Sequence, residues 1–110
     1  MARDSLGLLQ GTVDVLILRA LTRSAMHGYA ISQWIRERSD GALAVEDAAL
    51  YQALHRLERK GWVEAEWGIS DTNRRVKNYE ITPAGRRQLR SDVADLRRYV
   101  TALFAVLEPA

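Results

Sequence analysis

Two apolar patterns of different width open the chain. Residues 13–21, VDVLILRAL, are apolar on nearly every side, which predicts a first helix that is buried between two partners. After a short break, residues 27–39, HGYAISQWIRERS, have one apolar and one charged side, which is typical of an amphipathic second helix. Gly41 follows closely and is a natural helix stop. The inward residues of the second helix are expected to be Ile31, Trp34 and Ile35.

A leucine stripe predicts a third helix over about residues 46–60. With about 100° between successive residues, one narrow sector of this helix is apolar. The apolar sector holds Leu50, Ala53, Leu54 and Leu57. The opposite side holds small, hydrogen-bonding and cationic residues: Ala48, Gln52, His55, Arg56 and Arg59. Tyr51 lies on the border, where its ring can lean outward.

The next segment predicts two strands joined by a turn. Gly61 ends the third helix, and residues 62–67, WVEAEW, alternate with period two. Residues 68–75, GISDTNRR, are rich in turn formers. Residues 76–82, VKNYEIT, then return as a second strand.

The alternation also predicts which side of the hairpin faces the helices. Val63, Ala65 and Trp67 share one face of the first strand, and Tyr79 and Ile81 point inward from the second. A lone hairpin is only marginally stable in water. We therefore expect this hairpin to pack on the helices through Trp67, Tyr79 and Ile81.

A heptad seam predicts a long last helix. Thr82 is placed to cap its start, and Pro83 takes the favoured first position. Apolar residues then recur at spacings of four and three: Leu89, Val93, Leu96, Val100, Leu103 and Leu107. Such a stripe on so small a domain needs a partner surface, which is either its own domain or a second copy. We favour a dimer in which the first helix is also shared, through Val13 and Leu16.

Positive charge is concentrated in one part of the chain. The whole sequence has 16 Lys and Arg against 14 Asp and Glu, a net charge of +2, but the excess of basic residues lies in residues 55–90. A basic patch favours a polyanion through phosphate contacts and counterion release. A solvated surface helix and turn produce the same pattern, so charge alone does not separate the two. Three of the arginines, Arg86, Arg87 and Arg90, are expected to solvate the last helix.

The composition is that of an ordinary soluble globular protein, with 47% hydrophobic and 27% charged residues. The absence of cysteine excludes disulfides and thiolate metal sites, and it is compatible with a cytoplasmic setting. Near the start of the chain, Asp14 and Arg19 interrupt the apolar run. That run is too short and too charged for a membrane span, and no signal-peptide cleavage pattern follows it.

Three helices followed by a hairpin are the element order of a winged helix-turn-helix. The sequence thus predicts a mainly α fold with a small β-hairpin, divided into a DNA-binding domain at residues 1–82 and a C-terminal dimerisation helix at 83–110. In this fold a helix enters the major groove and the hairpin flanks it. Because Gly61 alone separates helix from strand, both cationic surfaces are expected on one side. The predicted DNA contacts are Tyr51, Gln52, His55, Arg56, Arg59, Asn73, Arg74, Arg75 and Lys77.

Four stretches in order carry a family resemblance: LLQGTVDVLILRAL, HGYAI, LYQALHRLERKGWVEAEW and NRRVKNYEITPAGRRQL. The chain resembles the PadR family of winged-helix transcriptional regulators, in its short form with one C-terminal helix. The resemblance covers roughly residues 8–90 and implies a homodimer that binds a pseudo-palindromic operator, usually as a repressor. It also implies that Tyr51 corresponds to the family's recognition-helix tyrosine, which donates its hydroxyl to a phosphate.

The sequence departs from the family at two positions beside Tyr51. Ala49 and Gln52 stand where the family often has serine and proline. The missing hydroxyl removes one potential phosphate contact, while the amide of Gln52 is able to pair with an adenine edge. We therefore expect this chain to have a sequence preference of its own.

The family resemblance further implies a small aromatic or apolar effector that relieves DNA binding. Its site is expected where the first helix meets the last, around Leu9, Val13, Val100 and Phe104. The three tryptophans could line such a pocket instead, although tryptophans in small domains are more often core anchors.

A second reading of the sequence is a winged-helix module that binds an acidic protein in place of DNA. An enzyme is rejected, because the two histidines, His27 and His55, have no metal-ligand spacing and no phosphate loop or nucleophile elbow is present. No cofactor and no metal are expected.

Overall fold

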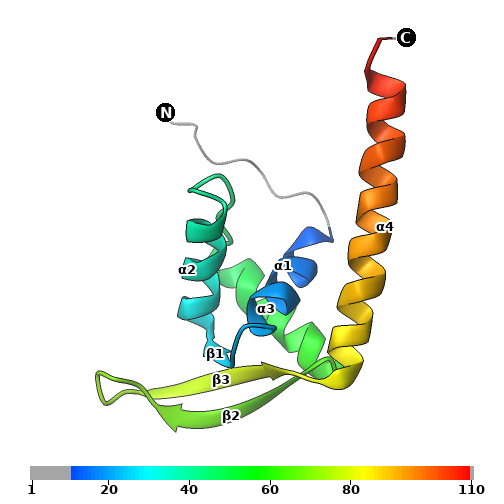
Figure 1. Cartoon of the computed structure of the whole chain (residues 1–110). Helices are drawn as coiled ribbons and strands as arrows, with labels where there is room; N and C mark the ends of the chain where they lie inside the picture. Colours follow the sequence, from blue (N-terminus) through cyan, green and yellow to red (C-terminus); the bar gives the residue numbers. More distant parts are fainter. Residues whose placement is uncertain (1–10, 110) are drawn as a thin grey trace.

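The computed structural model describes residues 11–109, which form four helices and one small antiparallel sheet. The helices are α1 (Thr12–Leu21), α2 (Gly28–Arg38), α3 (Asp47–Arg59) and α4 (Pro83–Leu107), and the strands are β1 (Met26–His27), β2 (Val63–Ile69) and β3 (Arg75–Ile81). Figure 1 shows α1, α2 and α3 on one face of the sheet, with α4 rising away at one end. The predicted fold class is confirmed.

The core lies where α1, α2 and α3 meet the sheet. The most deeply buried side chains come from all four of these parts: Ile17, Leu18, Leu21, Ile31, Ile35, Leu50, Leu54, Leu57 and Val63. Each side chain of this kind stabilises the fold by about 1.5–3 kcal/mol relative to an exposed one. The leucine stripe predicted for α3 is confirmed. In α1, however, Val13, Val15 and Leu16 are only partly buried against this core.

The sheet has three strands where the sequence predicted two. In β1, Met26 lies opposite Tyr79 and His27 opposite Asn78, which gives the strand order β1-β3-β2. A two-residue strand is too short to show any alternation, so periodicity could not reveal it. The pairing of β1 with β3 fixes the start of α2 against the edge of β3.

The register of the hairpin explains which of its side chains are buried. The pairs on the face toward the helices are, from the core outward, Val63–Ile81, Ala65–Tyr79, Trp67–Lys77 and Ile69–Arg75. Tyr79 and Ile81 are buried as predicted, but Trp67 is 55% exposed. The prediction that Trp67 packs under the hairpin is therefore wrong. The turn of the hairpin extends beyond the helices, as Figure 1 shows, and Trp67, Ile69 and Arg75 of the outer pairs are exposed.

The turn of the hairpin is shorter than the sequence predicted. Ile69 and Arg75, both expected in the loop, face each other as the last paired residues. Ser70 N–H donates to the carbonyl of Arg74 at 2.8 Å, and Asn73 takes a left-handed conformation with φ of 59°. Asparagine tolerates that conformation better than most residues. The cations near the turn are thus held by strand pairing and a closed loop.

The start of α4 is fixed by the predicted cap. Thr82 Oγ1 accepts a hydrogen bond from Gly85 N–H at 3.0 Å and donates one to the carbonyl of Gly61 at 2.7 Å. Pro83 is the first helical residue, as expected. A Cβ on Gly85 would lie 2.1 Å from the carbonyl oxygen of Trp62, so only glycine fits here. The joint between hairpin and α4 is therefore closely packed.

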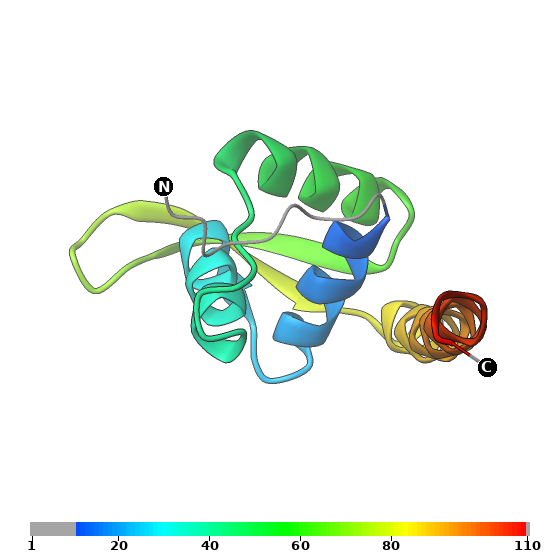
Figure 2. The same cartoon turned by 90° about the horizontal axis from the view of Figure 1, so that it is seen from above.

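Only the first part of α4 belongs to the core. Leu89 is buried there and Val93 packs against it. Beyond this point the helix leaves the domain, and Figure 2, seen from above, shows it at the end of the molecule opposite the turn of the hairpin. The remaining seam residues, Leu96, Val100, Leu103 and Leu107, are exposed in the chain taken alone.

Candidate nucleic-acid interface

The outer face of α3 is polar, cationic and open. Tyr51, Gln52, His55 and Arg59 are exposed, and Arg56 is half-buried. Together with Ala48, these side chains line one shallow depression. Figure 2 shows α3 along one side of the molecule, with the hairpin projecting beyond one end of it. The five α3 residues predicted to contact DNA thus share one surface.

Arg56 has a partner that the sequence did not predict. Its Nη2 lies 2.7 Å from Oδ1 of Asp14 in α1, and the two side chains are 42% and 21% exposed. This ion pair ties the outer face of α3 to α1 and sets the direction of the guanidinium. The sequence signal for this pair was Asp14, the carboxylate that interrupts the apolar run of the first helix together with Arg19.

The hairpin contributes the second group of cations. Arg75 places its guanidinium 4.4 Å from the centre of the Trp67 ring. Lys77 Nζ lies 3.5 Å from Oε1 of Glu58 in α3, and 5.7 Å from the ring centre of Tyr79. Asn73 and Arg74 are exposed in the turn. Stacking and ion pairing therefore hold Arg75 and Lys77 on the face of the hairpin that looks toward the helices.

A hollow of about 840 Å³ joins these two groups. It is lined by the start of α2, by Tyr51 of α3 and by the inner face and turn of the hairpin. Arg74, Arg75 and Lys77 are among its lining residues. Tyr51 lines both this hollow and the depression on α3, so the two form one continuous surface.

Tyr51 reaches this position because α2 begins with a glycine. A Cβ on Gly28 would lie 2.5 Å from the Tyr51 hydroxyl and 2.7 Å from Cζ of its ring. A side chain there would displace the ring. The pair therefore explains why glycine stands at position 28.

Tyr79, on the face of β3 toward the helices, does not supply acid–base chemistry. Burial raises the pKa of its hydroxyl above the ordinary value of 10.0, and the nearby Lys77 opposes this rise. The hydroxyl is therefore neutral at physiological pH.

Three of the four residues predicted for an effector site, Val13, Val100 and Phe104, lie in the part of the chain that the structure describes. Leu9 lies outside the described residues. Val13 packs against the core, while Val100 and Phe104 lie on the exposed part of α4. The hollow between α1 and α4 is lined instead by other residues, among them Asp14, Trp62, Asp92, Asp95 and Tyr99.

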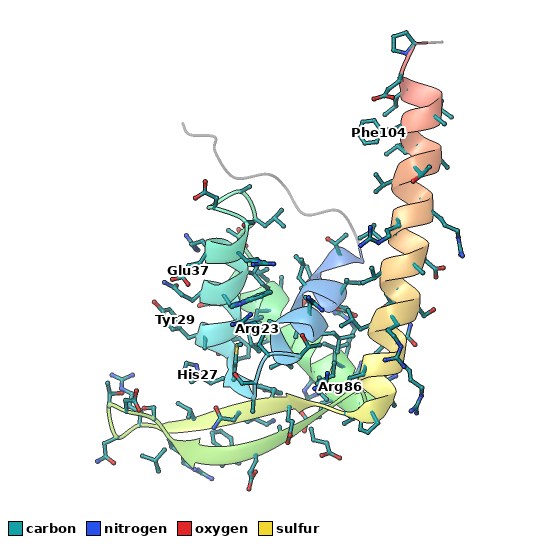
Figure 3. The ribbon with its side chains drawn as sticks, viewed as in Figure 1. Arg23, His27, Tyr29, Glu37, Arg86 and Phe104 are labelled. Atoms are coloured by element: carbon teal, nitrogen blue, oxygen red, sulfur yellow. The ribbon has the colours of Figure 1, made fainter. Side chains whose placement is uncertain are left out.

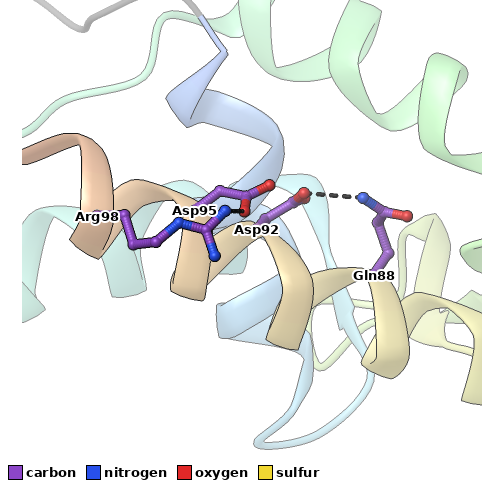
Figure 4. Close-up of polar contacts among 4 residues, drawn as sticks. All are labelled: Gln88, Asp92, Asp95 and Arg98. Carbon is purple, nitrogen blue, oxygen red and sulfur yellow. Dashed lines mark hydrogen bonds and ion pairs between the residues drawn. The ribbon is translucent and has the colours of Figure 1, made fainter.

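Polar contacts occupy the side of α4 next to this second hollow. Figure 4 shows the amide of Gln88 donating to Asp92, at 2.8 Å, and Arg98 paired with Asp95. Leu96 of the apolar seam also lines this hollow, whereas Val100, Leu103 and Leu107 are exposed further along the helix.

Two of the three tryptophans anchor the core, and each has a cation beside its ring. Trp34 and Trp62 are partly buried against the core. Arg23 lies 5.9 Å from the ring centre of Trp34, and Lys60 lies 4.8 Å from that of Trp62. Trp67 is the exception, because it is exposed beside the hollow.

Residues 11–109 lack two kinds of feature. No group of three or more His, Asp or Glu side chains within this range is placed to hold a metal ion. Over the same residues, none of the helices has the length and apolar character that crossing a membrane requires.

Comparison with known proteins decides the family. Residues 17–91 match the model of the Transcriptional regulator PadR-like family. The chain belongs to this PadR-like family. The resemblance seen in the sequence is thereby confirmed, and so is the prediction that the chain is not an enzyme, since PadR-like proteins are transcriptional regulators.

The PadR-like chain also has similar relatives over most of its length. It is 37% identical over 83 residues to an uncharacterised protein of Lysinibacillus sphaericus, covering 74% of this chain and 75% of that one. A solved transcriptional regulator from Clostridium thermocellum is 28% identical with a TM-score of 0.83, covering 90% of this chain and 96% of that one.

A PadR protein with its operator shares the fold. The structure of Bacillus subtilis PadR in complex with operator DNA matches with a TM-score of 0.67 and 22% identity. The match covers 74% of this chain and 47% of that longer one. At this level of identity the likeness concerns the fold alone.

Proposed function

We propose that this PadR-like regulator binds a pseudo-palindromic DNA operator as a homodimer, with α3 in the major groove and the hairpin as the wing. The observation that carries the proposal is the position of Tyr51, which lines both the depression on α3 and the cationic hollow of the hairpin. One continuous surface therefore presents hydrogen-bonding groups and cations from two segments. A duplex needs both, because bases are read in the groove and phosphates are held beside it.

Each part of the surface has a distinct role. The amide of Gln52 is suited to pair with an adenine edge, and His55 lies one turn further along the same face. Arg59 and Arg56 supply charge along the helix, while Tyr51 donates its hydroxyl to a phosphate. The contacts assigned to the wing are Asn73, Arg74, Arg75 and Lys77.

We assign the contact between the two copies of the homodimer to the exposed seam of α4. Leu96, Val100 and Leu103 continue the spacing of the buried Leu89 and the partly buried Val93, yet all three are exposed. An exposed heptad seam of this kind is stabilised by a second helix with the same pattern. The partly buried Val13 and Leu16 of α1 are assigned to the same interface.

The direction of regulation is part of the same proposal. A protein bound across a promoter excludes other proteins from that DNA, so we assign repression in the cytoplasm. We assign relief to a small aromatic or apolar effector bound where α1 and α4 meet. Support comes from Asp14, which lines the hollow between these helices and also holds Arg56 of the reading face.

Gel-shift binding to the upstream region of the protein's own gene tests the proposal. We expect a saturable complex that resists competitor DNA and loses affinity steeply with salt. Replacement Arg75→Ala should lower the slope of log affinity against log salt by about one. If neither this region nor that of any neighbouring gene forms such a complex, the proposal fails and an acidic protein partner becomes the better reading of the basic surface.

A further inference from the structure

Three large aromatic side chains are exposed around the hollow between α2, α3 and the hairpin. Tyr29 is 69% exposed, Trp67 is 55% exposed and Tyr51 is 50% exposed, and all three line this hollow. They come from three different elements. A gathering of exposed rings on one surface marks a site where another molecule binds.

Each ring is held in place by a neighbour. Arg75 stacks over Trp67 at 4.4 Å, and the Tyr29 ring is stacked on that of His27 with centres 6.5 Å apart. Tyr51 lies against Gly28, where no side chain would fit. Figure 3 shows His27 and Tyr29 on the outer side of α2, directly above the hairpin. The rings are thus ordered before a partner arrives, which reduces the entropy lost on binding.

The charges around the hollow favour an anion. Three cations, Arg74, Arg75 and Lys77, line it together with one carboxylate, Asp71. The opposite face of the same hairpin carries acidic side chains instead, because alternate residues point to opposite faces. The exposed members of that outer face are Glu64, Glu66 and Glu80. Only one side of the hairpin is therefore suited to a polyanion.

His27 adds a directed hydrogen-bond donor. Its Nδ1 accepts a hydrogen bond from Ala30 N–H at 3.3 Å, as the N-terminal cap of α2. In the neutral ring the proton must then be on Nε2. His27 lines the hollow, so it can offer this N–H to an anionic oxygen there.

From these observations we propose that the hollow seats the sugar–phosphate backbone of one DNA strand, with Tyr29, His27 and Trp67 as contacts in addition to those predicted from the sequence. This inference rests on the proposed function. Phosphate oxygens meet Arg75, Lys77 and the His27 N–H, and the apolar faces of deoxyribose rings pack on Trp67 and Tyr29. The hollow thereby links the groove contacts of α3 to the phosphate contacts of the wing.

Thiol protection tests which surface the DNA covers. The chain has no cysteine, so Tyr29→Cys introduces a single thiol into the hollow. The control is Arg38→Cys, at the exposed far end of the same helix. The probe is the duplex from the upstream region of the protein's own gene, at saturating concentration, and the readout is the rate of maleimide modification. We expect the duplex to slow modification at position 29 at least tenfold and to leave position 38 unchanged.

Affinity provides a second, independent measurement. Tyr29→Ala and Trp67→Ala should each weaken binding of the duplex about tenfold, which corresponds to about 1.4 kcal/mol. The control for Trp67 is Ile69→Ala, an exposed apolar residue on the same face of β2 that does not line the hollow. It should change affinity less than twofold. Trp67→Phe, which keeps a ring for Arg75, should recover part of the loss.

The outcomes separate this inference from the proposed function. If the unmodified protein forms no specific complex, the proposed function has failed. If it binds the duplex but position 29 stays fully reactive, or both alanine variants bind normally, the hollow is not a DNA site although the function stands. Protection of position 29 by salicylate, used as a small aromatic anion, but not by the duplex would also overturn the inference.

Discussion

Asp14 of α1 holds Arg56 of α3 through an ion pair of 2.7 Å between Oδ1 and Nη2. The guanidinium thus belongs to the reading face, while its partner belongs to a helix that also packs on α4. Arg56 is 42% exposed, and pairs of this kind contribute only about 0.2–1 kcal/mol to stability. The consequence of the pair is therefore expected in DNA recognition more than in folding.

Replacing Asp14 should change specificity. Asp14→Asn frees Arg56 and removes a negative charge beside the surface, so binding to random duplex should tighten while the preference for the operator falls several-fold. Titration of operator and random duplexes at equal salt measures both. Asp40→Asn is the matched control, because it removes the same charge at an exposed position whose φ of 53° suits asparagine. Equal changes in the two variants would contradict a specific role for the pair.

The contact between Gly28 and Tyr51 predicts a clash that a second substitution relieves. Gly28→Ala places a Cβ against the Tyr51 ring, which is half-exposed and can move aside, so it should lower the free energy of unfolding by about 1 kcal/mol, the lower end of the range for overpacking. In a Tyr51→Ala background the same change should be much less harmful, because the obstructing ring is gone. Urea unfolding of the four proteins gives the coupling free energy. Strict additivity would show that the two residues do not constrain each other.

Gly85 should tolerate no side chain. A Cβ there would lie 2.1 Å from the backbone oxygen of Trp62, which cannot rotate away as a side chain can. Gly85→Ala should therefore reduce the free energy of unfolding by about 3 kcal/mol, the upper part of the range for overpacking. Ala94→Gly, in the exposed middle of α4, should cost only about 1 kcal/mol. Similar urea midpoints for the two variants would contradict the close packing of Gly85 against the backbone of Trp62.

The seam of α4 predicts a dimer that one charge can disrupt. Leu103→Glu places a carboxylate in the proposed helix–helix contact and should give a monomer in sedimentation, with a large loss of operator affinity. Val106→Glu is the control, since Val106 is 83% exposed and lies outside the seam. A truncation before Leu96 should behave like Leu103→Glu. A folded dimer of the truncated chain would mean that the seam has another role.

Tyr79 should make the fold sensitive to alkaline pH. Burial raises the pKa of its hydroxyl above 10.0, so above that pH the unfolded chain releases this proton while the folded chain retains it. Stability should then fall as pH rises beyond about 10. Tyr79→Phe should show a smaller fall between pH 10 and pH 11 than the unmodified protein. Tyr99→Phe, at an exposed ring of α4, is the control and should leave the slope unchanged.

Long periodic patterns could be predicted from the sequence, but local exceptions could not. The leucine stripe of α3 and the cap at Thr82 depend on neighbours in the chain, so spacing alone reveals them. The position of Trp67 depends on how far the hairpin extends past the helices, which no alternation encodes. The two-residue β1 is too short for any pattern.

The candidate site likewise has some residues that the sequence predicts and others that it does not. The exposed face of α3 follows from helical geometry, so its residues could be predicted from the sequence. Tyr29 and His27 join the surface only because β1 fixes the start of α2 beside β3. Similarly, the link from Asp14 to Arg56 spans 42 positions in the chain. Contacts of this kind depend on tertiary packing and have no local signature.

The central claim is that α3 and the hairpin read DNA as one surface, and the salt dependence of operator binding tests it most directly. The slope should be measured for the unmodified protein, for Arg59→Ala, for Arg75→Ala and for the double variant. Each single change should lower the slope by about one and the double change by about two. If one of the two arginines can be removed with no change in slope while the other lowers it, only one of the segments contacts the DNA phosphates, and the account is contradicted.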